Sequence, residues 1–350
     1  MALDFTSTEK IVLYGLVKHP TLNDRQLSEL IGVKPSTTTA IRTRLRQKDV
    51  FRTKRIPIAH KLGYELLVTV FGSMEPGVKE SDRKKFSKWI RGIPGVFLSL
   101  ESSNSMFFTG YFKNFSEYRS VADEAWEKFG ESTLFQTDKW YWPMFSFARS
   151  KLVNFFDYSS PLRFAFKIKE KAKVERERET LSKERLTRKE RTVLQGLINY
   201  PEISDKAVAE KIGASRQAVA SMRKRFEEKG ILRTIRIVDM EKVGYQILAV
   251  GSIHFQPKAS LNSRWIGVER TVETVPMILN VASSPETVVM SYMKDYEEYH
   301  ATKKEALEFY AKSDFYREEP TSLIFPLSDT KITKDFDFSR FMERFVQEED

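Results

Sequence analysis

The sequence predicts an α+β protein built as a tandem duplication of a winged helix-turn-helix plus ferredoxin-like (βαββαβ) domain. Three observations predict this class. One long stretch of sequence occurs twice in the same register. Each copy opens with three short segments of helical period, with a glycine between the second and the third. Each copy then continues with six segments that alternate between strand-like and helix-like composition.

The repeat sets the organisation of the chain. Leu13 aligns with Leu194, a separation of 181 residues. The same separation relates a series of further pairs: Pro20 and Pro201, Gly32 and Gly213, Gly63 and Gly244, Tyr64 and Tyr245, Pro76 and Pro257, Tyr111 and Tyr292. Near the end of each copy the separation becomes 180, as for Phe156 and Phe336. We refer to these two stretches as copy 1 and copy 2.

The predicted boundaries follow from the repeat and from changes in composition. Segment 161–186 is rich in Lys, Arg and Glu, which predicts a charged helical linker, and 341–350 reads as an acidic tail. The remaining segments are two winged helix-turn-helix modules at 1–58 and 187–239, and two ferredoxin-like domains at 59–160 and 240–340.

The first part of each copy reads as a helix-turn-helix. In copy 1 an apolar helical stripe is followed by a turn at Pro20 and a short second helix. Asp24 and Asp205 are the expected N-cap residues of the second helices. Gly32 and Gly213 come directly after these helices, where a tight turn between crossed helices favours a residue without a β-carbon.

A third helix is predicted at 34–48 and again at 215–229. Its apolar stripe predicts the inward positions Thr38, Ile41 and Leu45 in copy 1 and Val219, Met222 and Phe226 in copy 2. Its other face carries short hydroxyls, an amide and cations, the groups that contact base edges and phosphates. The candidate DNA-binding residues on this face are Lys34, Ser36, Thr37, Thr39 and Arg44, then Ser215, Arg216, Gln217, Ser221, Lys224 and Arg225.

The segments VFRTKRIPI and ILRTIRIVD follow the third helices and read as strands of a wing. A wing beside a recognition helix contacts the phosphate backbone. The candidate wing contacts are Arg52, Lys54, Arg55, Arg233 and Arg236. The alternative, that each of these cations is ordinary solvated surface, is equally open.

The second part of each copy has the order β-α-β-β-α-β. In copy 1 strand-like ELLVTVFGSM begins at Glu65, and a final strand is expected near WYWPMFSF. Copy 2 repeats the order from QILAVGSIHF to SLIFPL. The aromatic residues of these domains are expected to fill the core and an interface between sheets.

Composition narrows the functional classes. The formal net charge is +10, concentrated in 1–58 (+6), 161–191 (+6) and 192–240 (+3), which favours a polyanionic partner for those segments. The chain has no cysteine, and its four histidines are scattered, so we expect no metal site and no cofactor. No apolar stretch reaches about 20 residues, and no signal peptide is recognised, so we expect a cytoplasmic, nucleoid-associated protein without membrane contact.

A winged helix followed by a βαββαβ domain resembles the leucine-responsive/asparagine regulator (Lrp/AsnC) family, which is abundant in archaea. The residues that carry the resemblance are DRQLSELIGV and DKAVAEKIGA, KDVFRTKRI and KGILRTIRI, KLGY and KVGY, and IPGV. The resemblance implies a dimer fused into one chain, paired recognition helices and sheet domains that associate into homo-oligomers. It also implies a small-molecule effector, whose identity the sequence does not specify.

The leading interpretation is a sequence-specific regulator of transcription that binds double-stranded DNA and is not an enzyme. Because the two third helices differ, the expected site is an imperfect palindrome or two unlike half-sites. Two alternatives are open. Siroheme decarboxylases look like the same two-part fold, and a nucleoid-organising protein would coat DNA with little sequence preference.

Overall fold

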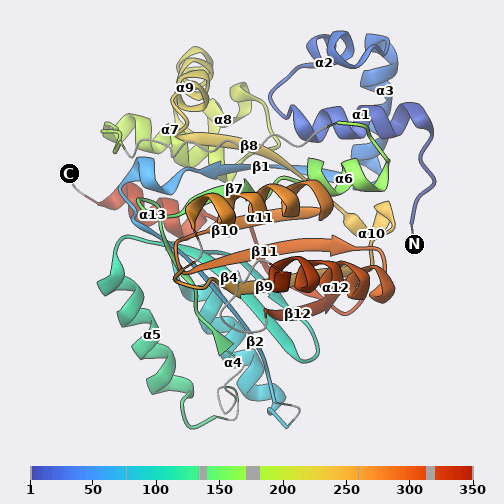
Figure 1. Ribbon diagram of the computed structural model, residues 1–350. Coiled ribbons are helices and arrows are strands. Elements are labelled where there is room, and N and C mark those ends of the chain that lie inside the picture. Colours follow the sequence, from blue (N-terminus) through green and yellow to red (C-terminus); the bar gives the residue numbers. More distant parts are fainter. Residues whose placement is uncertain are drawn as a thin grey trace. The chain divides into compact units, whose positions relative to one another are not determined.

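The computed structural model describes residues 2–75, 77–132, 134, 140–170, 182–258, 260–312 and 320–348. The chain divides into two compact units, both discontinuous in sequence. Unit 1 comprises Met1–Thr53, Ser150–Arg178 and Ile235–Ser328, and unit 2 comprises Lys54–Arg149, Glu179–Thr234 and Asp329–Asp350. Each unit therefore joins the helical module of one copy to the sheet domain of the other copy (Figure 1).

Each helical module has three helices followed by a strand. In unit 1 these helices are α1 (Ser7–Lys18), α2 (Asp24–Ile31) and α3 (Pro35–Gln47), and in unit 2 they are α7 (Arg188–Asn199), α8 (Asp205–Ile212) and α9 (Arg216–Glu228). Gly32 and Gly213 end α2 and α8 with φ of 69° and 68°, a left-handed conformation that glycine adopts without steric cost. The strands that follow, β1 (Phe51–Pro57) and β8 (Leu232–Val238), contain boundaries between the units.

The helices start at residues that satisfy their own first turns. Thr6 and Glu9 form a capping box on α1, and Thr187 and Glu190 form the same box on α7. The predicted N-caps Asp24 and Asp205 are wrong by one residue. Asn23 and Ser204 cap α2 and α8, because their side chains accept hydrogen bonds from the backbone N–H three residues later.

Asp24 and Asp205 do not cap a helix but form ion pairs between the second and the third helix of their modules. Asp24 pairs with Arg42 of α3 at 2.8 Å, and Asp205 pairs with Arg223 of α9 at 3.0 Å. The two pairs occupy equivalent positions of the repeat, and all four side chains are at least two-thirds covered. This bridge fixes the third helix against the second in both modules.

The sheet of unit 2 has the strand order β13-β3-β4-β2-β5, with β6 also beside β2, and is antiparallel in every described pairing. Helices α4 and α5 cover one face, where Phe86, Ile90, Tyr118 and Phe129 join the core. The elements are η1 (Ala59–Leu62), β2 (Leu66–Ser73), α4 (Glu80–Gly92), β3 (Val96–Glu101), β4 (Ser105–Phe112), α5 (Phe115–Phe129), β5 (Trp140–Tyr141), β6 (Met144–Ser146) and β13 (Lys331–Asp335).

The sheet of unit 1 has the order β12-β9-β11-β10-β7, with helices α11 and α12 packed on one face. Its elements are β7 (Lys151–Phe155), α10 (Met240–Val243), β9 (Ile247–His254), α11 (Leu261–Thr274), β10 (Met277–Ala282), β11 (Glu286–Met293), α12 (Tyr296–Lys312) and β12 (Thr321–Pro326). The α+β class and the order of a helix-turn-helix followed by a ferredoxin-like domain are confirmed.

The last strand of each copy pairs with the sheet of the other copy. Strand β7, from copy 1, runs beside β10 of copy 2, with Phe155 opposite Leu279. Strand β13, from copy 2, runs beside β3 of copy 1, with Lys331 opposite Glu101. This exchange places the last strand of copy 1 in unit 1 and that of copy 2 in unit 2. Figure 1 shows the green β7 next to the orange β10.

A short helix follows each exchanged strand, α6 (Ser159–Ala165) and α13 (Ser339–Gln347). In unit 2 the ring of Phe341 lies 4.6 Å from that of Tyr64, and in unit 1 the Tyr245 hydroxyl donates to Pro161 O at 2.8 Å. The expected acidic tail at 341–350 is thus mostly helix α13 in the described chain. The expected linker at 161–186 begins inside α6, and its residues 171–181 lie outside the described chain.

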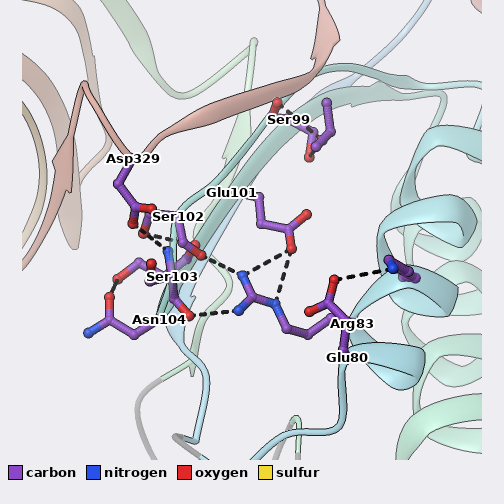
Figure 2. A network of polar contacts seen from close by, with 11 residues as sticks. Glu80, Arg83, Ser99, Glu101, Ser102, Ser103, Asn104 and Asp329 are labelled. Atoms are coloured by element: carbon purple, nitrogen blue, oxygen red, sulfur yellow. Dashed lines mark hydrogen bonds and ion pairs between the residues drawn. The ribbon is translucent and has the colours of Figure 1, made fainter.

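The turn between β3 and β4 is held by one arginine of α4. Arg83 pairs with Glu101 at 3.1 Å and donates to the carbonyl oxygens of Ser102 and Ser103 at 2.6 and 2.7 Å (Figure 2). Asp329 accepts from the backbone N–H of Ser103 at 2.8 Å. These donors and acceptors satisfy one another, which identifies the cluster as a structural anchor of the sheet.

Candidate nucleic-acid interface

The third helix of each module presents one buried and one exposed face. Thr38, Ile41 and Leu45 of α3 are buried, as are Val219 and Phe226 of α9, while Met222 is half-buried. The predicted inward positions therefore face the core. The residues half a turn away form the outermost stripe of each helix, as the helical repeat requires.

The outer face of α3 is cationic and rich in hydroxyls. The helix contains three arginines and no acidic residue. Lys34, Ser36, Thr39 and Arg44 are exposed and Thr37 is half-buried. The Thr39 hydroxyl donates to Asp24 Oδ2 at 2.8 Å, so it is engaged within the module.

The outer face of α9 has longer polar side chains. Arg216, Gln217, Ser221 and Lys224 are exposed. Ser215 is the N-cap of α9, and its hydroxyl oxygen accepts from the backbone N–H of Ala218 at 3.2 Å. Ser215 therefore begins the helix, and the side chains that follow it form its exposed face.

Arg44 and Arg225 lie at the edge of this face and reach back to the first helix of the module. Arg44 pairs with Glu9 at 2.6 Å, and Arg225 pairs with the equivalent Glu190. Burial opposes ionisation of Glu9, but the hydrogen bonds from Thr6 and the charge of Arg44 together lower its pKa. Both arginines remain about half exposed, so each can contact a phosphate only in competition with its own carboxylate.

The wing residues separate into exposed and buried groups. Arg233 is exposed, and Arg52 and Lys54 are half-buried. Lys54 contacts Asp335, at 2.7 Å to its carbonyl oxygen and 3.3 Å to its carboxylate.

Arg55 and Arg236 are turned inward. Arg236 is only 7% exposed, and its guanidinium donates to the carbonyl oxygens of Leu16 and Pro20. Arg55 donates to Leu197 O at 3.2 Å, and burial lowers its pKa. Both side chains therefore have a packing role, which differs from the wing contacts predicted for them.

The predicted contacts omit one position on the outermost stripe of α3. Thr43 of α3 is exposed and aligns with Lys224 of α9. It lies seven residues after Ser36, which places both on the outermost stripe of the helix. The seven-residue spacing from Ser36 is the sequence pattern that could have identified Thr43 as a candidate contact.

Two other classes of site, a metal site and a membrane span, concern the described residues as well. No group of three or more His, Cys, Asp or Glu side chains there could hold a metal ion. In that same part of the chain, no helix combines the length and the apolar character that a membrane span requires.

Neither a protein-family model nor a curated protein sequence matches this chain. Solved structures do match. The siroheme decarboxylase NirDL matches over 97% of this chain and 98% of its own, with 14% identity and a TM-score of 0.55. NirDL in complex with an iron-uroporphyrin III analogue matches over 97% and 99%, with 13% identity and a TM-score of 0.55.

Regulators of the AsnC family match a smaller part of the chain. One from Agrobacterium tumefaciens is 20% identical over 40% of this chain and 90% of its own, with a TM-score of 0.34. AsnC from E. coli is 13% identical over 41% and 93%, with a TM-score of 0.32. The structural neighbours thus include AsnC/Lrp regulators over about two-fifths of the chain and an Lrp/AsnC-like decarboxylase over nearly all of it.

The likeness to NirDL shows a shared fold, and it corrects one expectation. The sequence favoured a protein that is not an enzyme. The solved structures that match 97% of the chain are those of an enzyme, so that prediction is contradicted.

Proposed function

We propose that this protein binds double-stranded DNA through the outer faces of α3 and α9 and thereby regulates transcription. One observation carries the proposal. In both modules the third helix is held on the core by its apolar stripe, and its opposite stripe presents exposed hydroxyl, amide and cationic groups. A third helix that presents such groups outward is the geometry by which a helix-turn-helix enters the major groove.

The start of α9 is the part best suited to read bases. Arg216 and Gln217 are exposed in its first turn, where recognition helices contact base edges. An arginine fork matches the N7 and O6 acceptors of guanine, and a glutamine amide matches N6 and N7 of adenine. Lys224 lies two turns further along the outward stripe and suits a phosphate.

The two helices support unlike half-sites. The positions of Arg216, Gln217 and Lys224 are occupied in α3 by Pro35, Ser36 and Thr43. Short hydroxyls reach fewer base atoms than a guanidinium or an amide. We therefore assign the stronger base preference to α9, and expect α3 to contribute mainly backbone contacts.

Selection of bound duplexes from a random pool tests the proposal, followed by fluorescence anisotropy on the selected site. The variant Arg216→Ala/Lys224→Ala should weaken binding about tenfold or more and relax the preference in one half-site. The control Lys84→Ala/Lys88→Ala removes the same charge from exposed positions on α4 and should bind as the unaltered protein does. Equal losses in both variants would contradict the assigned faces, and absence of any selected duplex would contradict DNA binding.

A second candidate is action on an iron-containing tetrapyrrole, favoured by one observation. The match to NirDL covers nearly all of both chains, so the likeness in fold extends over both copies and not over one module alone. Titration of the protein with iron-uroporphyrin III, followed by its visible absorption, tests the candidate. A saturable spectral change with release of CO2 would support it, and an unchanged spectrum would count against it.

A further inference from the structure

The sheet domain of unit 1 contains a cavity between its sheet and its two helices. The cavity has a volume of about 150 Å³. Strands β9, β11 and β12 contribute its floor through Gly251, Ser291 and Ser322, and α11 and α12 contribute its walls. Cavities of about this size bind a single benzene-sized molecule when their walls are apolar.

The equivalent space in unit 2 is occupied by aromatic side chains. Trp142 aligns with Ser322, because Tyr141 pairs with Phe71 as Thr321 pairs with the equivalent Ser252. In unit 2 the ring of Trp142 lies 6.2 Å from Phe108, and Trp140 lies 5.9 Å from Phe86, all within or against one core cluster.

Copy 2 has smaller residues than copy 1 around this space. Gly267 stands at the position of Phe86, Ser322 at that of Trp142, and Gly251 at that of Val70. The Tyr310 ring fills part of the space, 3.3 Å from where a β-carbon of Gly267 would lie. The cavity is therefore a difference between two otherwise similar domains, made by side-chain size.

Polar groups in the walls are placed for an amphipathic ligand. The hydroxyls of Tyr299 and Ser322 lie 2.6 Å apart, and the Thr271 hydroxyl lies 3.1 Å from that of Tyr310. The Arg270 guanidinium lies over the Phe309 ring, 4.3 Å from its centre, and is exposed. Lys303 also lines the cavity, together with one acid, Glu305.

We infer that this cavity binds a small carboxylic acid whose apolar body is about the size of one six-membered ring. The apolar body lies over Gly251, Val289 and Met293, which contribute apolar or backbone surface to the floor of the cavity. The carboxylate is held by Arg270, whose planar guanidinium forms paired hydrogen bonds with carboxylates. The inference does not depend on DNA binding, and it is tested without DNA.

The experiment titrates the full chain with phenylacetate, and with the neutral phenylacetamide, by isothermal calorimetry. Both probes should bind saturably, with phenylacetate the tighter. Ser322→Trp introduces the residue of copy 1 and should abolish binding of both. Gly251→Val is the second filling variant; its added β-carbon meets only Thr321 O at 3.5 Å, so the fold should tolerate it.

Arg270→Gln separates the carboxylate contact from the cavity. It should weaken phenylacetate about tenfold, or about 1.4 kcal/mol, and leave phenylacetamide unchanged. Lys304→Gln, an exposed neighbour outside the cavity lining, is the matched control and should change neither. Absence of saturable binding, or binding that survives both filling variants, would overturn the inference. Equal losses for both probes in Arg270→Gln would overturn the role of the guanidinium.

Discussion

Arg55 of β1 donates a hydrogen bond to the carbonyl oxygen of Leu197 in the last turn of α7, at 3.2 Å. Arg236 makes the equivalent bond to Leu16 in α1. The residue four places after each leucine is a proline, Pro201 or Pro20, which has no N–H to satisfy that carbonyl. The wing arginine supplies the missing donor in both modules.

Replacement of Arg236 should therefore destabilise the protein. Arg236→Ala leaves two carbonyl oxygens without their donor in a buried place and should lower the free energy of unfolding by about 2 to 4 kcal/mol. Arg233→Ala removes an exposed arginine from the same strand and is the control, with an expected change within about 0.5 kcal/mol. Urea denaturation followed by circular dichroism measures both. Similar midpoints for the two variants would show that the buried bonds contribute little.

A lysine added to α3 should strengthen DNA binding. Thr43→Lys places on α3 the side chain that α9 has at Lys224. One additional phosphate contact should make the slope of log affinity against log salt steeper by about 0.9. Ser81→Lys adds the same charge to an exposed position on α4 and should leave the slope unchanged. Anisotropy titrations at several salt concentrations measure the slopes, and identical slopes for the two variants would place Thr43 away from the duplex.

Substitution of the residue with positive φ after the third helix should change stability differently in the two copies. Gly230 has φ of 63° and the aligned Asp49 has φ of 49°. Gly230→Ala places a β-carbon in the left-handed region and should cost about 1 kcal/mol, although nothing lies within 4 Å. Asp49→Gly should raise stability or leave it level, since relief of strain offsets the added chain entropy. The midpoints of urea unfolding measure both effects. A higher midpoint for Gly230→Ala than for the unaltered protein would contradict the predicted strain.

Lys334 should make the free energy of unfolding depend on pH above neutrality. It is 5% exposed, and burial lowers its pKa to about 8. The unfolded chain, with a lysine pKa near 10.4, binds more protons between these values, so the free energy of unfolding should rise with pH there. From about pH 7.5 to 9.5 the rise should be about 2 kcal/mol.

Lys334→Asn, which carries the residue found at the aligned Asn154, provides the comparison for that pH series. Its stability should be flatter across the same range because the titrating group is gone. Parallel curves for the two proteins would mean that Lys334 keeps its ordinary pKa.

Much of the local structure was predictable from the sequence. Short-range signals determine it: the helical stripe ending at Leu45, the glycine at Gly32 and the alternation in the strands all depend on neighbours within a few residues. Because the sequence repeats, each of these patterns occurs twice, and the two copies support the same prediction. The N-caps were missed by one residue because Asn23 and Asp24 are both good caps, and only the hydrogen-bond geometry separates them.

Long-range relationships were not predictable. Nothing in the composition of Lys151–Phe155 indicates which sheet it joins, because the edge strand of either sheet offers the same backbone partners. Arg236 reads as a surface cation, and its burial depends on a carbonyl group 220 residues away. The amphipathic helix α13 was not predicted, because three acidic residues directly after it, at 348–350, give the segment 341–350 an acidic composition.

The exchanged strands have a consequence for how this polypeptide is made. Neither unit can be completed until synthesis has passed β10, since the sheet of unit 1 needs Met277–Ala282 and that of unit 2 needs Lys331–Asp335. A ribosome that stalls after the first half would release a product with an unfilled sheet edge, exposed to aggregation. Two separately expressed halves, by the same logic, should recover their folded state only when mixed.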